Sequence, residues 1–255
     1  MLTCLSRRLL PALVGGFAAV AALLAGPARA EAVAIAGCDS YAPYSDAALP
    51  GDGFANDLTA QIMQHAGYEV SVTMQPWIRA LEGTETGAFD ILPSAWYTEE
   101  RARTLLFSAP IAMSRLVFVK PAGSPFEFRS LEDLHGLTVG TVSGYAYDPD
   151  FLASTLFQRP AVTDILLNLR MVAARHIDLT LDDELTLRFI INSRAPELAP
   201  LLALTRSALS QQPLLVAFSK KRPDAEQLLA TFNAGLARMR ADGSYQRLLT
   251  QHRME

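Results

Sequence analysis

The chain has 255 residues, half of them hydrophobic, with 22 basic and 26 acidic side chains and a formal charge of −4 at pH 7. This size and composition suffice for one large or two modest hydrophobic cores. Duplex nucleic acid is a poor partner, because binding to it depends on neutralising phosphates and no basic stripe runs along the chain. Beyond residue 30, no apolar run reaches the length of a membrane span.

Residues 1–30 have the pattern of a signal peptide. Arg7-Arg8 precede an apolar run from Leu9 to Leu24, and Ala28-Arg29-Ala30 provides the small residues that a signal peptidase recognises. A membrane anchor is the alternative, but it needs about 20 apolar residues, whereas this run has 16. We therefore expect export to the periplasm. The mature chain then carries 19 basic and 26 acidic residues, a charge of about −7 by the same counting.

The mature chain alternates short strand-like runs with segments at helical spacing. In its first half we predict helices at 56–66 and 77–86, a further helix opening at 97–101, and strands at 33–37, 70–74, 89–92 and 116–120. In its second half we predict strands at 137–142, 177–183 and 214–218, and helices that open at Asp148-Pro149 and at Pro223. This order is typical of an α/β architecture with a largely parallel sheet.

The pattern of strands and helices restarts near residue 137, which predicts a second lobe. In the simplest arrangement, residues 31–118 and 214–255 form lobe I and residues 119–213 form lobe II. Two crossing segments, near 117–121 and 212–217, then join the lobes. Two such segments make a hinge, which permits closure without disrupting either core.

Several short motifs follow one another in the order of a known family. The most informative is residues 97–110, YTEERARTLLFSAP, in which an arginine follows a hydroxyl residue and two acids and precedes a Phe-Ser-Ala-Pro corner. The others lie at 41–44, 130–136, 175–178 and 242–245. Together they resemble the bacterial extracellular solute-binding proteins, family 3, which serve polar amino-acid ABC transporters as periplasmic substrate-binding proteins. The resemblance implies a two-lobed periplasmic binding fold of the type II kind.

The resemblance assigns one charged residue to each of the two charged groups of an amino acid. A free amino acid presents a carboxylate beside an ammonium, so a selective site needs a fixed cation and a fixed anion. Arg101 stands where the family grips the carboxylate, and its planar guanidinium can do so through two parallel hydrogen bonds. Asp183 stands where the family receives the ammonium; alternation along the strand puts Asp182 on the opposite face. The alternatives are that Arg101 pairs with Glu99 or Glu100, and that Asp183 caps the helix that begins at residue 184.

Further site residues come from the same comparison and from side-chain type. In the resembling proteins, Ser94 offers a polar contact, and the backbone at Tyr145 and Ala146 touches the ligand carboxylate. We expect Tyr41 and Trp96 to line the site and Trp77 to be packing. Trp96 and Cys38 depart from the family pattern, since cationic amino-acid binders carry an acid at the position of Cys38. Both changes argue against a lysine, arginine or histidine ligand.

Metal and cofactor chemistry have no support in the sequence. Cys4 lies in the leader, so Cys38 has no partner for an internal disulfide in the oxidising periplasm. The four histidines lack metal-ligand spacing, and no nucleophile elbow occurs. We therefore predict no cofactor, no metal and no enzyme of the nucleophilic kind.

The predicted function is a monomeric binding protein that closes its lobes on an amino acid or a related zwitterion. It would deliver the solute to an inner-membrane ABC permease. One alternative is a ligand-sensing module that docks on a membrane receptor. The other is an enzyme like the cyclohexadienyl dehydratases, which use a closely similar fold, with Glu99, Glu100 or Asp183 as the acid.

Overall fold

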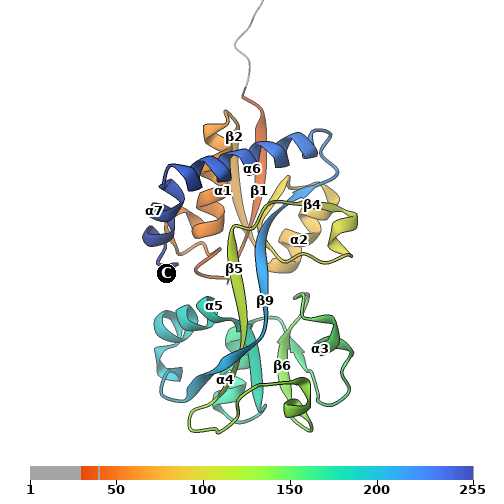
Figure 1. Ribbon diagram of the computed structural model, residues 1–255, viewed down its shortest axis with the longest axis vertical. Helices are drawn as coiled ribbons and strands as arrows, with labels where there is room; N and C mark the ends of the chain where they lie inside the picture. The colour runs from red at the N-terminus through yellow and green to blue at the C-terminus, as the bar shows by residue number, and fades with distance from the viewer. Residues whose placement is uncertain (1–29, 40, 255) are drawn as a thin grey trace, which may run out of the picture.

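The computed structural model describes residues 30–39 and 41–254, so the predicted signal peptide lies outside the described part. Within that part, no helix combines the length and the apolar character needed to cross a membrane. Figure 1 shows two lobes, one above the other, connected by two long strands. The two-lobed α/β fold predicted from the sequence is confirmed.

The upper lobe contains the first three strands and both ends of the described chain (Figure 1). Strand β1 (Ala32–Cys38) lies between β2 (Glu69–Gln75) and β3 (Ile91–Ala95) and is parallel to both. Its helices are α1 (Phe54–His65), α2 (Trp77–Thr86), α6 (Ala225–Ala241) and α7 (Ser244–Gln251). The apolar stripe of α6 is buried at Leu228, Phe232 and Leu236, as the spacing of these residues predicts.

The lower lobe repeats the scheme with residues from the middle of the chain. Strand β6 (Val139–Val142) is parallel to β7 (Ala161–Val162) and to β8 (Leu179–Asp183). Its helices are α3 (Pro149–Ala153), α4 (Ile165–Ala173) and α5 (Glu184–Phe189), followed by a π-helical turn at Ile190–Arg194. Asp148 caps α3, its side chain accepting a hydrogen bond from the Asp150 amide at 2.9 Å, as predicted.

Two antiparallel strands, β5 (Ala112–Pro121) and β9 (Leu202–Ser219), run from one lobe into the other (Figure 1). The sheet order is β2-β1-β3-β9-β5-β8-β6-β7, with β4 (Leu105–Phe107) also paired to β9. In β5, residues 116–119 pair with β8. We therefore propose that the lobe boundary in β5 lies before Leu116, a few residues earlier than the predicted boundary at 118.

One predicted helix is wrong. The segment that opens at 97–101 forms only a single 3-10 turn, Arg101–Arg103, before β4 begins. The physical reason is the length of the connection: β4 pairs with β9 already at Leu105, so the chain returns to the sheet before a second turn can form. This short turn still fixes the backbone of Arg101, because the Arg101 amide donates to the Thr98 hydroxyl at 3.1 Å.

Candidate functional site

A small cavity lies where the two lobes meet. It contains all but one of the predicted site residues: Tyr41, Ser94, Trp96, Arg101, Tyr145 and Ala146. Three further residues complete the lining, namely Cys38, Trp77 and Leu214. The upper lobe contributes the ends of β1 and β3, and the lower lobe contributes the loop after β6. Apart from Arg101, no lining residue carries a formal charge.

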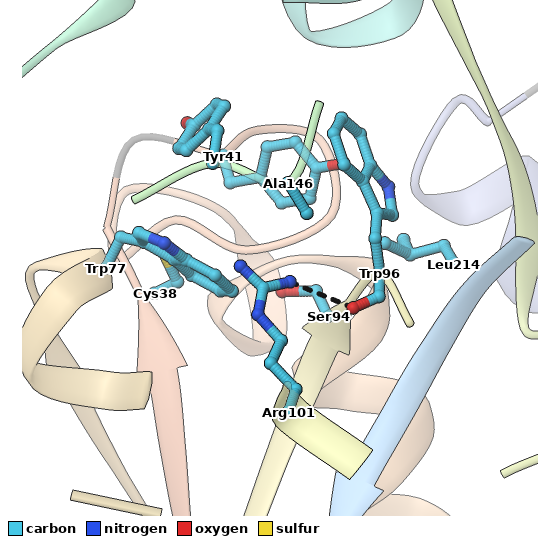
Figure 2. A pocket seen from close by; sticks show the side chains of 9 residues that line it. Cys38, Tyr41, Trp77, Ser94, Trp96, Arg101, Ala146 and Leu214 are labelled. Atoms are coloured by element: carbon cyan, nitrogen blue, oxygen red, sulfur yellow. Dashed lines mark hydrogen bonds between the residues drawn. The ribbon is translucent and has the colours of Figure 1, made fainter. Parts of the chain in front are cut away.

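Arg101 lies in the middle of this cavity with its guanidinium directed at the opposite lobe (Figure 2). One amino group, Nη1, donates to the Trp96 carbonyl at 2.9 Å, and the other, Nη2, donates to the Gly144 carbonyl at 3.1 Å. The guanidinium carbon also lies 5.0 Å from the centre of the Trp77 ring, within the range of a cation–π contact. The side chain is thus held by two neutral carbonyls and an aromatic face.

No acidic side chain in the described chain forms an ion pair with Arg101. The alternative pairing with Glu99 or Glu100 is therefore absent, and Glu99 instead accepts from the Tyr97 hydroxyl at 3.0 Å. Burial lowers the pKa of Arg101, although the more distant Glu85 and Glu100 oppose this shift. A buried cation that lacks an anionic partner is costly, so the cavity is electrostatically suited to an anion.

Gly144 of the lower lobe accepts hydrogen bonds from two side chains of the upper lobe. Its carbonyl accepts from Arg101 and, at 3.0 Å, from the Trp77 indole nitrogen, both of which come from the upper lobe. The residue has a φ of +76°, a left-handed conformation that favours glycine. A Cβ atom here would also lie 2.3 Å from the Ile78 side chain. Glycine therefore suits this position by its backbone conformation, and a larger residue would also displace the exposed Ile78 side chain.

Three polar side-chain atoms around the cavity are buried and have no hydrogen-bond partner among residues 30–39 and 41–254. They are the Tyr41 hydroxyl, the Ser94 hydroxyl and the Trp96 indole nitrogen. The three side chains are nearly inaccessible, with residues exposed by 7%, 2% and 6% respectively. A buried polar group without a partner costs about 1–3 kcal/mol. A polar ligand in this cavity would remove that cost, which is the property expected of a binding site.

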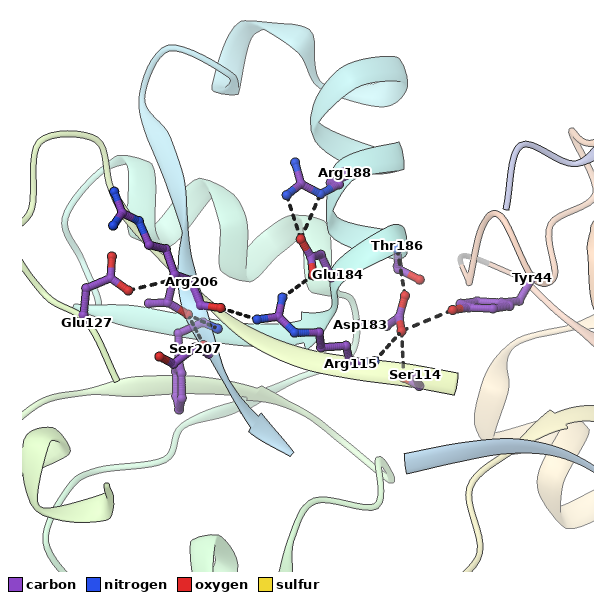
Figure 3. A network of polar contacts seen from close by, with 12 residues as sticks. Tyr44, Ser114, Arg115, Glu127, Asp183, Glu184, Thr186, Arg188, Arg206 and Ser207 are labelled. Carbon is purple, nitrogen blue, oxygen red and sulfur yellow. Dashed lines mark hydrogen bonds and ion pairs between the residues drawn. The ribbon is translucent and has the colours of Figure 1, made fainter. Parts of the chain in front are cut away.

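Asp183 is the predicted site residue that does not line the cavity. Figure 3 shows its carboxylate between β5, the start of α5 and Tyr44 of the upper lobe. One oxygen, Oδ2, accepts from the Ser114 hydroxyl at 2.7 Å and from the Tyr44 hydroxyl at 3.3 Å. The other, Oδ1, accepts from the Thr186 amide at 3.0 Å. The alternative role, a cap on α5, is therefore confirmed, while a role toward a ligand stays a prediction.

The environment of the two adjacent aspartates differs. Burial raises the pKa of Asp183, but hydrogen bonds from Ser114 and from the Thr186 amide hold the shift back. Burial raises the pKa of Asp182 from 3.8 to about 8, and repulsion by Asp183 and Asp164 adds to the effect. One Asp182 oxygen, Oδ1, accepts from the Asp183 amide at 2.7 Å, whereas Oδ2 has no partner.

Sequence reasoning placed Trp77 in the packing and left out Leu214 and Ser114. Trp77 packs against the core as predicted, but its ring also lies against Arg101 and lines the cavity (Figure 2). Leu214 belongs to a continuous apolar run of β9, and nothing in that run marks one residue as facing a ligand. Ser114 is a lone hydroxyl in β5, and only the register with β8 reveals its contact with Asp183.

Comparisons with known proteins agree with this geometry. The chain is 26% identical over 214 residues to the L-cystine-binding protein TcyJ of Escherichia coli, covering 82% of this chain and 77% of the relative. Among solved structures, a mutant of ArgBP from T. maritima has a TM-score of 0.74 at 20% identity, covering 88% of this chain and 96% of the other. A histidine kinase sensor domain with similarity to periplasmic binding proteins has a TM-score of 0.75 at 24% identity, with the same two coverages.

The sequence model of one family matches residues 33–254, which is nearly all of the described chain. The order of the motifs, the two-lobed fold and the cavity between the lobes all agree with this match. The chain belongs to the bacterial extracellular solute-binding proteins, family 3.

Proposed function

We propose that this protein captures an amino acid in the periplasm and delivers it to an ABC importer of the inner membrane. The observation that carries the proposal is the buried guanidinium of Arg101, which lies in a cavity between the lobes without an acidic partner. A ligand carboxylate would supply the missing anion and could engage two parallel N–H groups of the guanidinium. The relative named as an L-cystine-binding protein supports the choice of an amino acid.

Five other lining residues have a role in this proposal. The Ser94 hydroxyl, which is buried without a partner, joins Arg101 at the carboxylate. The backbone at Tyr145 and Ala146 approaches the same end from the lower lobe, while Tyr41 and Trp96 form aromatic walls.

Asp183 receives the ligand ammonium in this proposal, although it lies outside the cavity lining of the closed structure. The Tyr44 hydroxyl reaches Asp183 Oδ2 at 3.3 Å, a longer contact than the 2.7 Å from Ser114. Since Tyr44 belongs to the upper lobe, its hydroxyl leaves Asp183 when the lobes separate. An ammonium can then take its place before closure, and it forms a stronger, charge-assisted hydrogen bond with the carboxylate.

In this proposal, ligand binding closes the two lobes, and the closed form is what the membrane partner recognises. Contacts between the lobes are already formed by Trp77 and Arg101 at Gly144 and by Tyr44 at Asp183. A ligand that contacts both lobes favours the closed form because it binds that form better. A permease and a sensory receptor both recognise a closed shape, so the partner is tested separately by co-purification with the membrane fraction.

The dehydratase alternative fits the site less well. General acid catalysis needs a carboxyl group within hydrogen-bond reach of the substrate. Glu99 and Glu100 are exposed, and neither they nor Asp183 line the cavity. A spectrum for the aromatic product after incubation with prephenate tests this alternative directly, and we expect none to form.

The proposed function is tested by thermal unfolding of the mature protein with the common L-amino acids. A ligand present at 100 times its dissociation constant adds about 2.7 kcal/mol to stability, which corresponds to a rise in melting temperature of about 5–11 °C for a chain of this size. Calorimetry then gives the dissociation constant of each amino acid that raises the melting temperature. If no amino acid stabilises the protein, the proposed function is wrong.

A further inference from the structure

The residues that line the cavity bear on the side chain of the ligand as well as on its carboxylate. Figure 2 shows Trp77 and Cys38 on one side of the Arg101 guanidinium and Trp96 and Leu214 on the other. Apart from Arg101 and Ser94, the lining side chains are aromatic, aliphatic or thiol groups.

A charged ligand side chain would have no counter-charge in this cavity. Arg101 is the sole formal charge among the lining residues, and the ligand carboxylate occupies it. Cys38 remains an uncharged thiol, because burial raises its pKa to about 12. Its Sγ atom is within 3.2 Å of the Asp39 carbonyl, to which it donates. Since an unpaired buried charge is strongly unfavourable, basic and acidic side chains are both rejected.

A fully apolar ligand side chain would leave a donor without a partner. The indole N–H of Trp96 can donate but cannot accept, and it is buried and unpaired. Figure 2 shows this nitrogen on the ring edge turned away from the guanidinium, so a carboxylate held by Arg101 does not reach it. The group that satisfies Trp96 therefore belongs to another part of the ligand.

We propose that the cavity selects an amino acid whose side chain is uncharged and carries a hydrogen-bond acceptor, and that Trp96 determines this preference through its indole N–H. This selectivity presupposes the amino-acid binding proposed above and narrows it to one chemical class. A site built to hydrogen-bond a ligand group discriminates strongly against an analogue that lacks the group, because the protein donor is then left buried and unpaired.

The test is calorimetry with four amino acids of similar length: glutamine, norleucine, glutamate and lysine. Glutamine has an uncharged acceptor, norleucine has no acceptor, and the other two are charged. We expect wild-type protein to bind glutamine about tenfold more tightly than norleucine, a difference of about 1.4 kcal/mol. Glutamate and lysine bind more weakly than norleucine, because their side-chain charges remain unpaired.

Two variants isolate the indole N–H. Trp96→Phe keeps an aromatic ring, and we expect it to weaken glutamine binding about tenfold while norleucine binding changes less than about twofold. Trp77→Phe is the matched control, because the Trp77 N–H is already occupied by the Gly144 carbonyl. The control loses a contact between the lobes and should weaken all ligands by the same factor, which leaves the preference for glutamine intact.

The outcomes separate this inference from the proposed function. Three results would overturn the proposed selectivity while leaving amino-acid binding in place. Wild-type protein could bind glutamine and norleucine equally, or bind a charged amino acid more tightly. Trp96→Phe could also lose affinity for glutamine and norleucine by the same factor. Failure of every amino acid to bind overturns both. The wild-type comparison does not depend on either variant folding.

Discussion

Replacing Arg101 by alanine is the most direct perturbation of the site. The change removes the donors to the carbonyls of Trp96 and Gly144, at 2.9 Å and 3.1 Å, and the contact with the Trp77 ring. It also removes a buried charge that no acidic side chain of the described residues pairs with. In the ligand-free protein these effects oppose each other, so we expect the free energy of unfolding to change by no more than about 1 kcal/mol.

Ligand binding should respond much more strongly than stability. Removing one partner of a buried, hydrogen-bonded charge pair costs about 2–5 kcal/mol. At 1.4 kcal/mol for each factor of ten, the loss of affinity in Arg101→Ala lies between about 30-fold and about 4,000-fold. Both the amino acid and the same molecule without its amino group should lose affinity, because each carries the carboxylate that Arg101 binds.

The assay is titration calorimetry of the best amino acid from the thermal screen, paired with urea unfolding of the ligand-free variant. Arg103→Ala is the matched control, since Arg103 lies on the same 3-10 turn but is exposed and does not line the cavity. The control should bind normally. An Arg101→Ala protein that folds and binds its ligand within about threefold of wild type would refute the reasoning, since 2 kcal/mol is the smallest loss it allows.

Three further predictions concern acidic groups and lobe closure. In Asp183→Asn the cap on α5 is retained, and calorimetry should show at least about tenfold weaker binding of the amino acid but little change for its analogue without the amino group. Burial raises the pKa of Asp182 from 3.8 to about 8, so its carboxyl is neutral in the folded state and ionised in the unfolded state between these values. The free energy of unfolding therefore contains a contribution from this raised pKa that is complete below pH 4 and is lost as the pH rises to 8, by up to about 1.4 kcal/mol per pH unit. In urea unfolding, Asp182→Asn should reduce this pH dependence. Arg194 of the lower lobe forms an ion pair with the buried Asp46 of the upper lobe. Because the Arg194 side chain is a third exposed, we expect Arg194→Gln to weaken lobe closure by no more than about 1 kcal/mol. X-ray scattering should then show a larger radius of gyration for the variant.

Each of these predictions has its own contradicting result. Equal loss of both ligands in Asp183→Asn would mean that the carboxylate supports the fold of the site and does not receive the ammonium. An unchanged pH dependence in Asp182→Asn would show that this carboxyl is ionised in the folded protein. An unchanged radius of gyration in ligand-free Arg194→Gln would show that this ion pair does not hold the lobes together.

Most elements could be predicted because their signals are local. Helix α2 has the predicted bounds, 77–86, and β1, β2 and α1 differ from prediction by one or two residues at each end. Periodicity, a cap at Asp148 and the proline after it act within a few residues of one another. The helix predicted to open at 97–101 did not form because local signals do not show long-range pairing. Its start signal is local, but the pairing of Leu105 with β9 ends the segment after one turn.

The site was predictable as far as its residues sit in recognisable motifs. Arg101 and Tyr41 lie in motifs whose order is visible in the chain, and the resemblance to the family pointed to Ser94, Tyr145 and Ala146; the structure brings all five to one cavity. Strand alternation places Asp182 and Asp183 on opposite faces of the sheet but does not predict which residues each carboxylate contacts. Ser114 and Tyr44, which meet Asp183, are 69 and 139 residues away along the chain.

The sequence by itself determined the class of protein, the alternation of strands and helices, and the cation at Arg101, because these depend on residue type and short spacing. Tertiary structure alone decided that Cys38, Trp77 and Leu214 line the same cavity, that the Asp183 carboxylate contacts the Tyr44 hydroxyl, and that the Trp96 N–H has no partner among the described residues. The physical reason is that a cavity between two lobes is formed by segments far apart in the chain. Their meeting depends on the register of β5 and β9, which the packing of both lobes sets together.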